Sequence, residues 1–163
     1  MSKHKEEKTN VMRVLEQKKI AYTAHTCPHE EGMAVDGVTV AKSMGFDPAI
    51  VFKTLVARGA SKQYYVFDVP VAENLDLKKA AKAVGEKSIE MIHQKELLPL
   101  TGYVHGGCSP AGMKKLFPTV FHSSAENLAA MIVSAGKIGY QVELAPHDLA
   151  ALVRAKFADI IAE

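Results

Sequence analysis

Cysteine is scarce in this chain of 163 residues: there are two, Cys27 and Cys108, and they lie far apart. Such sparse cysteines fit free thiols in a reducing compartment better than a disulfide scaffold. Long hydrophobic runs are lacking too, since no segment approaches the roughly 18 apolar residues of a membrane-spanning helix. The charged opening segment, MSKHKEEK, has no apolar core of the kind a signal peptide needs. We therefore expect a cytoplasmic protein that does not associate with membranes.

A strong excess of one charge is also missing, because the formal net charge is only +2. Dedicated nucleic-acid binders usually show a larger basic excess, so the composition alone does not predict one. Hydrophobic residues make up 48% of the chain and charged residues 23%, a balance typical of a folded globular protein. The length suits one domain. We expect a single domain over residues 1–163, with residues 1–8 flexible.

The local patterns predict short helices and short strands in irregular order. Apolar residues at helical spacing, with Thr9 and Asp76 as capping side chains, predict helices over 9–19, 38–45, 77–84 and 146–153. Runs of β-branched and aromatic residues predict strands over 20–26, 49–57, 63–70, 88–92, 119–123, 131–135 and 139–144. Residues 27–33 look like a loop. This irregular mixture favours a mixed α/β fold over a doubly wound parallel sheet.

The stretch TGYVHGGCSPAGMKK, residues 101–115, holds four glycines and raises the question of a phosphate loop or a nucleophile elbow. It is a poor Walker loop, because Met113 stands where the motif G-x-x-x-x-G-K-[ST] requires lysine. It is also a poor nucleophile elbow. Pro110 directly follows Ser109 and lacks the N–H that would line an oxyanion hole. Neither motif is therefore predicted.

Ser109 is instead a good helix N-cap, with Pro110 at the first helical position. The glycines before it could then expose backbone amides beside the positive end of that helix. Such a nest can hold a carboxyl group, an ester oxyanion or a phosphate. A plain glycine-rich turn between two elements is the alternative interpretation.

Lys53 lies inside the apolar run AIVFKTLV. Strand alternation places it on one face with Val51 and Leu55, while Phe52 and Thr54 occupy the other face. A packed ammonium group is costly unless it reaches a pocket or an anionic partner. The alternative is an edge strand that uses a lysine to prevent aggregation. The pattern leaves both interpretations open.

Potential metal ligands occur in two places, HTCPH with His25, Cys27 and His29, and HGGC with His105 and Cys108. Neither has the C-x2-C or H-x3-H spacing of common structural zinc sites. Residues alternating along a strand end also point to opposite faces. A metal site is not favoured by this spacing.

The order and spacing of several segments resemble the YbaK/EbsC family, whose members are free-standing bacterial Cys-tRNA(Pro) deacylases similar to the editing insertion domain of prolyl-tRNA synthetase. The segments that carry the resemblance are KTNVMRVLEQKKIAYTAHTC, VFKTLVA, LDLKKAAKAVGEKSIEM, TGYVHGGCSPAGMKK, MIVSAGKIGYQVEL and PHDLAALVRAKFADI. The resemblance covers almost the whole chain. It implies a mixed α/β fold with a barrel-like mixed β-sheet surrounded by helices, and a pocket for the aminoacylated 3′ end of tRNA.

The resemblance also implies a set of site residues. Lys53 matches the family's essential pocket lysine, which contacts the terminal nucleotide or its phosphate. The substrate site would further include the loop residues Gly102, Gly106, Gly107 and Ser109, together with Tyr22, Ser134 and Gly136. Cys108 stands where many relatives have an aliphatic residue, so we interpret it as a small hydrophobic residue rather than a nucleophile.

The expected mechanism follows from the same resemblance and needs no cofactor or metal. In that family the cysteinyl thiol of the mischarged residue attacks its own ester carbonyl and expels the tRNA. The amides near Gly106 and Gly107 would hold the oxyanion while Lys53 fixes the terminal nucleotide. The rivals are a deacylase for another small residue, such as Ala-tRNA(Pro), and a non-catalytic module that binds an aminoacyl or nucleotide end.

The expected partners are tRNA and prolyl-tRNA synthetase, because nothing in the chain resembles an anticodon reader. The predicted helix over 77–84 carries Lys78, Lys79 and Lys82, which we interpret as contacts to tRNA phosphates. A merely solvated helix face is the alternative. If these lysines contact tRNA phosphates, the affinity for tRNA should fall as the salt concentration rises.

Overall fold

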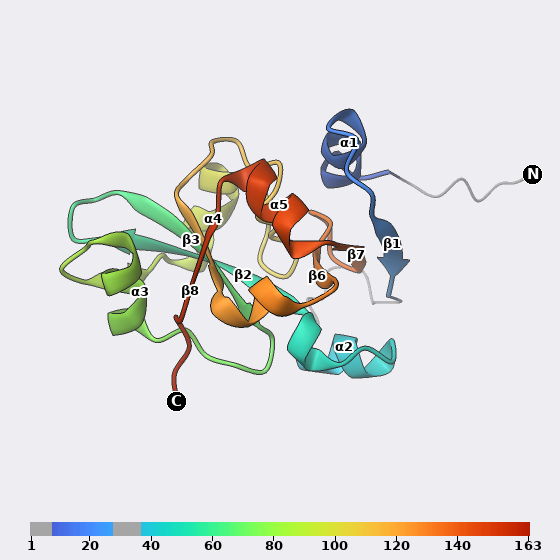
Figure 1. The fold of residues 1–163 in the computed structure, drawn as a ribbon. Coiled ribbons are helices and arrows are strands. Elements are labelled where there is room, and N and C mark those ends of the chain that lie inside the picture. Colours follow the sequence, from blue (N-terminus) through green and yellow to red (C-terminus); the bar gives the residue numbers. More distant parts are fainter. Residues whose placement is uncertain (1–7, 28–36) are drawn as a thin grey trace, which may run out of the picture.

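The computed structural model describes residues 8–27 and 37–163. The helices and strands follow one another as shown in Figure 1. The helices are α1 Asn10–Gln17, α2 Gly37–Ser43, α3 Leu77–Val84, α4 Gln94–Thr101 and α5 Pro146–Val153, with 3-10 turns at Pro48–Ile50 and Ser123–Asn127. The strands are β1 Thr23–Thr26, β2 Phe52–Gly59, β3 Tyr64–Pro70, β4 Ile89–Met91, β5 Thr119–His122, β6 Met131–Ser134, β7 Tyr140–Leu144 and β8 Lys156–Ala158. In the described residues no helix is both long and apolar enough to cross a bilayer.

The larger sheet has five strands in the order β4-β2-β3-β5-β8. Its centre is the antiparallel hairpin of β2 and β3, in which Thr54 lies opposite Asp68 and Lys53 lies opposite Val69. Strand β5 joins β3 in parallel, and β8 joins β5 in parallel. Antiparallel and parallel pairs thus share one sheet, which confirms the predicted mixed α/β fold.

The smaller sheet has three antiparallel strands in the order β1-β7-β6. An isolated parallel bridge between Val51 and Ile132 connects it to the start of β2. Strand β4 pairs with the far end of β2, at residues 57–59. Between these two contacts, around Lys53, Thr54 and Leu55, one edge of β2 pairs with neither β4 nor β6. The expected barrel-like sheet is therefore built as two sheets joined at this one bridge.

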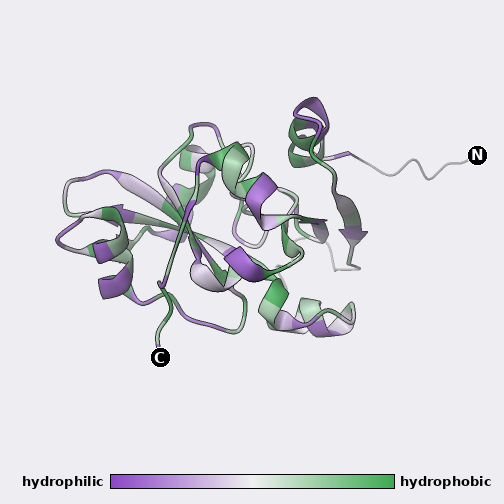
Figure 2. Ribbon diagram, in the orientation of Figure 1, coloured by the Kyte–Doolittle hydropathy of each residue, from purple (hydrophilic) through white to green (hydrophobic). Residues whose placement is uncertain are grey.

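The buried side chains form a large core between the two sheets and a second core on the other face of the larger sheet. Phe52, Val56 and Val66 belong to the first core, and Phe67 and Val69 belong to the second. Helix α3 covers the second core with Ala80 and Ala81. Figure 2 shows α1 and α3 each combining hydrophobic and hydrophilic residues, as amphipathic helices that cover a core do. Because both faces of β2 are covered, its burial does not alternate strictly.

The structure confirms the two capping side chains that were used to predict helices, Thr9 and Asp76. The side chain of Thr9 accepts a hydrogen bond from the Met12 amide, and that of Asp76 accepts one from the Lys79 amide. Gly85 ends α3 as predicted. The predicted loop over 27–33 lies outside the described residues from position 28 on. Residues 1–7 of the segment expected to be flexible lie outside them as well, while Lys8 pairs with Glu16.

The predicted helix after Ser109 was wrong, because residues 102–118 contain no helix. Ser109 is fully buried, and its hydroxyl accepts a hydrogen bond of 3.4 Å from the Ala111 amide within a turn. Gly112 then adopts a φ of 77°, which a continuing helix does not allow. The alternative interpretation of this stretch as a turn therefore describes its backbone.

Two elements were missed by the sequence patterns. Helix α4 contains Pro99, and its first turn is closed by the Glu96 carboxylate, which accepts a hydrogen bond of 2.9 Å from the His93 amide. Strand β8 is three residues long and pairs only with β5. Such a short strand depends on its neighbour in space rather than on its own composition.

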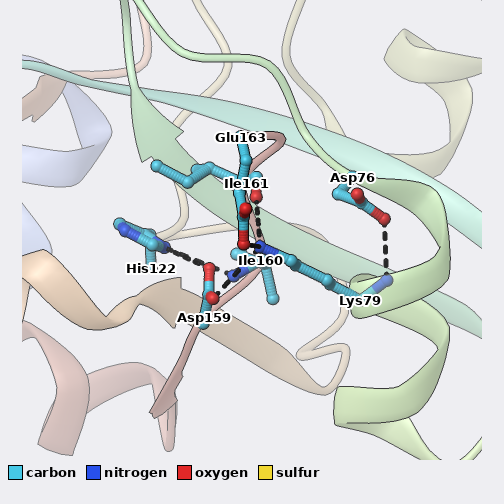
Figure 3. Close-up of polar contacts among 7 residues, drawn as sticks. All are labelled: Asp76, Lys79, His122, Asp159, Ile160, Ile161 and Glu163. Atoms are coloured by element: carbon cyan, nitrogen blue, oxygen red, sulfur yellow. Dashed lines mark hydrogen bonds and ion pairs between the residues drawn. The ribbon is translucent and has the colours of Figure 1, made fainter.

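The C-terminal segment is attached to α3 by Lys79 (Figure 3). The Lys79 ammonium donates to the Ile161 carbonyl at 2.9 Å and pairs with Asp159 at 3.1 Å and Glu163 at 3.4 Å. On the other side of the segment, Nδ1 of buried His122 accepts a hydrogen bond of 3.3 Å from the Ile160 amide. Burial lowers the pKa of His122, so the imidazole stays neutral and can accept this bond.

We predict that Lys79→Met loosens the C-terminal segment. Loss of the ammonium removes one carbonyl contact and two carboxylate contacts, so amide exchange over residues 159–163 should accelerate and the unfolding temperature should fall. Hydrogen exchange followed by mass spectrometry measures the first effect. Lys82→Met, an exposed position on the same helix, is the control. Equal exchange in both variants would contradict the role of Lys79.

Candidate functional site

A cavity of about 330 Å³ opens at the unpaired edge of β2, where the two sheets meet. Its walls come from α2, from β2, from the loop after α4 and from the segment that links β6 and β7. The polar and small residues that line it include Lys53, Thr54, His105, Gly106, Cys108 and Ser134. The cavity has the size of a pocket for a small ligand.

Lys53 is half-buried and lines this cavity. In β2 it projects from the same face as its partner Val69, away from the side chain of Thr54. Within the described part of the chain, its ammonium group makes no hydrogen bond or ion pair. A lysine in this setting is available to an anionic ligand. Lys53 therefore lies both in the lining of a cavity and beside the unpaired edge of β2, so the structure is compatible with each of its two interpretations.

The glycine-rich loop forms the opposite wall, with Gly106 at the cavity and Gly107 behind it. A Cβ atom on Gly107 would lie 3.1 Å from the Ile138 nitrogen, so the two backbones meet closely at this point. The Gly107 amide donates to the Val104 carbonyl at 3.0 Å and is thus already used in a turn. Among the described residues, nothing accepts a hydrogen bond from the Gly106 amide. Of the two predicted amides, that of Gly106 is the one left for a ligand.

Tyr103 holds the glycine-rich loop to the neighbouring turn at residues 134–136. Its hydroxyl donates to the Ala111 carbonyl at 2.6 Å, and its ring packs against Gly136. Gly136 has a φ of 93°, and a Cβ atom there would lie 2.9 Å from Tyr103 Cε1. The Gly136 amide donates to the Ser134 hydroxyl at 3.0 Å. Ser134 is thereby oriented at the cavity, while Gly136 supports it from behind.

Other predicted site residues lie away from the lining of the cavity. Gly102 ends α4, and Ser109 is buried in the turn beneath the loop. Tyr22 precedes β1, and its hydroxyl donates to Glu16 at 2.6 Å. The structure thus brings together Lys53, Gly106 and Ser134, with Gly107 and Gly136 supporting them.

Asp68 was missed by the sequence patterns. Its carboxyl group has no exposed surface, and Oδ1 accepts a hydrogen bond of 2.5 Å from the hydroxyl of Thr54, which lines the cavity. Oδ2 has no partner in the described structure. Loss of hydration raises the pKa of Asp68 to about 7, although the bond from Thr54 acts in the opposite direction. The signal available in the sequence was the single carboxylate inside the apolar strand YYVFDVP.

Cys108 is a protonated thiol in this cavity. Burial raises its pKa to about 12, and the negative charge of Asp68 adds to the effect. A thiol of this kind is not a nucleophile at neutral pH. This agrees with the interpretation of Cys108 as a small hydrophobic residue. Cys27 also lines the cavity, and both cysteines are free.

A family model described as an aminoacyl-tRNA editing domain matches residues 29–152. The chain belongs to this aminoacyl-tRNA editing family. A curated relative from Enterococcus faecalis, EbsC, is 45% identical over 98% of each chain and is described as a candidate Cys-tRNA(Pro)/Cys-tRNA(Cys) deacylase. This confirms the family that the sequence motifs indicated.

Solved structures show the same fold. A candidate trans-editing enzyme for prolyl-tRNA synthetase superposes with a TM-score of 0.79 at 24% identity, covering 94% of this chain and 96% of that one. A hypothetical protein superposes with a TM-score of 0.83 at 18% identity, covering 94% and 99%. At these identities the likeness concerns the fold alone.

In this editing-family chain, the three lysines expected to contact tRNA differ from one another. Lys78 and Lys82 are exposed on α3, whereas Lys79 is half-buried and holds the C-terminal segment. From the two potential metal sequences, Cys27, His105 and Cys108 line the cavity, although no group of three or more His, Cys, Asp or Glu among the described residues could hold a metal ion. His29 lies outside those residues.

We predict that Asp68 makes stability depend on pH. In the unfolded chain its pKa is near the ordinary value of 3.8, whereas in the folded protein it is about 7, so the folded state holds the proton longer. The wild type should therefore lose stability relative to Asp68→Asn as the pH rises from about 4 to about 7, by up to about 4 kcal/mol, and not change further above that range.

Urea unfolding of both proteins across this pH range measures the effect. Asp148→Asn, at an exposed position of α5, controls for the substitution itself. A constant difference between wild type and Asp68→Asn would mean that folding leaves the pKa of Asp68 unchanged.

Proposed function

We propose that this chain is a trans-editing deacylase that removes cysteine from mischarged Cys-tRNA(Pro). The observation that carries the proposal is the half-buried Lys53, without a described partner, in a cavity of about 330 Å³ that Gly106 also lines. The 45% identity to a candidate Cys-tRNA deacylase over 98% of both chains supports the same reaction. The free cysteines suit the cytoplasm, where charged tRNA is found.

The residues of the cavity favour positioning over nucleophilic attack. The Cys108 thiol is protonated, and the buried Asp68 carboxyl group is already bonded to Thr54. The substrate then supplies the nucleophile. Its cysteinyl sulfur forms a bond to its own ester carbonyl carbon, the bond from that carbon to the ribose oxygen breaks, and the thiol proton passes to the leaving ribose oxygen. The products are free tRNA and a four-membered thioester, which water hydrolyses.

Two groups of the chain assist this step. The Gly106 amide donates to the developing oxyanion, and the close contact behind Gly107 keeps that amide in place. The Lys53 ammonium binds the terminal nucleotide or its phosphate and so holds the ester at the cavity. Tyr22, Gly102, Ser109 and Gly136 lie behind or beside the cavity, and we propose that they act by shaping it.

We predict that Lys53→Ala lowers release of cysteine from Cys-tRNA(Pro) by on the order of 10²-fold, because the ester is no longer held in place. Release of radiolabelled amino acid from Cys-tRNA(Pro), Ala-tRNA(Pro) and Pro-tRNA(Pro) measures the activity and its specificity. Lys87→Ala, at an exposed position, is the control and should match the wild type.

The outcomes of that assay separate the alternatives. Faster release of alanine than of cysteine would indicate that the chain is a deacylase for Ala-tRNA(Pro). Binding of all three without release would make it a recognition module. Full activity of Lys53→Ala would remove the lysine from the mechanism.

We propose tRNA and prolyl-tRNA synthetase as partners, the second as a transient one that selects tRNA(Pro). The exposed Lys78 and Lys82 are the proposed phosphate contacts. Lys79 is left out of this surface, because its ammonium is used by Asp159, Ile161 and Glu163.

We predict that replacing Lys78 and Lys82 together by Gln flattens the salt dependence of tRNA binding. Each lost phosphate contact should reduce the slope of log affinity against log salt by about 0.7 to 0.9. Binding measured over a range of salt concentrations gives the slope. Lys18→Gln with Lys156→Gln, exposed positions on other elements, removes the same charge as a control. Equal slopes in the two double variants would mean that tRNA phosphates do not bind to Lys78 and Lys82 of α3.

A further inference from the structure

Half-buried Thr54 and fully buried Asp68 form a polar pair at the wall of the cavity. They lie opposite each other on β2 and β3, so their side chains share one face of the sheet. Thr54 lines the cavity, whereas Asp68 has no exposed surface. The 2.5 Å bond between Thr54 Oγ1 and Asp68 Oδ1 joins the two. Asp68 can therefore act on a ligand through Thr54.

The hydrogen-bonding capacity of the pair depends on the charge of Asp68. An ionised carboxylate only accepts hydrogen bonds, so the single hydroxyl proton of Thr54 is spent on it. The Thr54 oxygen then offers the cavity lone pairs and no proton. A protonated Asp68 could instead donate to Thr54, which would leave the Thr54 proton free to point at the cavity. The carboxylate form thus makes Thr54 an acceptor.

Besides Thr54, the lining of the cavity contains the ionisable side chains of Lys53, His105 and Cys108. The face that Asp68 shares carries Thr54 from β2, Phe121 from β5 and the Cys108 thiol from the glycine-rich loop. Lys53 adjoins Thr54 in the chain, but its side chain projects from the other face of β2. The negative charge of Asp68 raises the pKa of Cys108, which lines the cavity, so the field of Asp68 reaches the space where a ligand would lie.

We propose that Asp68 is a positioning residue that holds the Thr54 hydroxyl as a hydrogen-bond acceptor for the α-ammonium group of the aminoacyl ester. This inference rests on the proposed function and names the part of the substrate that the site recognises. The α-ammonium is the one cationic group at this end of the substrate, and it carries three donors. A buried carboxylate one hydrogen bond away favours a cation over a neutral donor. Lys53 and Asp68 would thus recognise opposite charges of the same ligand.

The test uses an inert analogue, 3′-(cysteinylamino)-3′-deoxyadenosine, in which an amide replaces the ester, together with its N-acetylated form, which lacks the cation. The wild type should bind the free amine about tenfold more tightly than the N-acetyl form at about pH 8. Asp68→Asn and Thr54→Val should lose this preference, whereas Thr54→Ser keeps the hydroxyl and should keep the preference. An equal loss of affinity for both compounds would assign Asp68 a purely structural role and overturn the proposal.

The pH profile provides a second readout. The ratio of wild-type to Asp68→Asn affinity for the free amine should rise as the pH increases through about 7, where Asp68 ionises. The analogue's own ionisation affects its binding to both proteins equally and therefore cancels in this ratio. A flat ratio, or a preference for the free amine that survives in Asp68→Asn, would exclude the carboxylate.

Turnover of Cys-tRNA(Pro) by the wild type is measured beside these binding experiments. Because the analogue cannot be cleaved, the preference for the free amine is tested whether or not the protein has deacylase activity. Failure of turnover with an intact preference would refute the proposed reaction and leave this inference standing. Turnover without the preference for the free amine would support the proposed reaction and refute this inference.

Discussion

The close contact between the glycine-rich loop and the turn at residues 136–139 holds the cavity together. Gly107 meets the backbone of Ile138, and Gly136 meets the ring of Tyr103, at distances that leave no room for a Cβ atom without movement. These contacts place the Gly106 amide and the Ser134 hydroxyl at the cavity. The glycines of this chain thus serve the site mainly by letting two backbones approach, and the loop needs no following helix.

The course of β2 explains how groups of opposite charge come to act on one cavity. Lys53 and Thr54 are neighbours in the strand and project from opposite faces of the sheet. Both line the cavity because it opens at the edge of β2, between the pairing with β4 and the bridge to β6. Lys53 thus reaches the cavity from one face, and Thr54, which is bonded to the Asp68 carboxyl group, reaches it from the other. This arrangement carries a cost in stability, since a carboxyl group is buried with one oxygen that has no partner among the described residues.

The lysines of α3 show that neighbouring residues of one motif can differ in their structural roles. The segment LDLKKAAKAVG gives three cations on one helix. Lys79 reaches the C-terminal segment, whose carboxylates and Ile161 carbonyl use its donors. Lys78 and Lys82 remain exposed. The separation follows from where residues 159–163 pack, a contact between positions about eighty residues apart.

Local interactions in the sequence determined most elements, because caps such as Thr9 and Asp76 and the β-branched runs of β2 and β3 act over a few residues. The sequence also indicated the family and Lys53, an ammonium group inside an apolar strand. The short β8 was decided by a tertiary contact, its pairing with β5, whereas helix α4 with its internal Pro99 and the turn at Ser109 rest on local hydrogen bonds that the sequence patterns did not reveal. The tertiary structure alone placed Asp68 beneath Thr54 and paired Lys79 with the C-terminal segment. Each of these depends on groups distant in the chain, whose meeting no local pattern records.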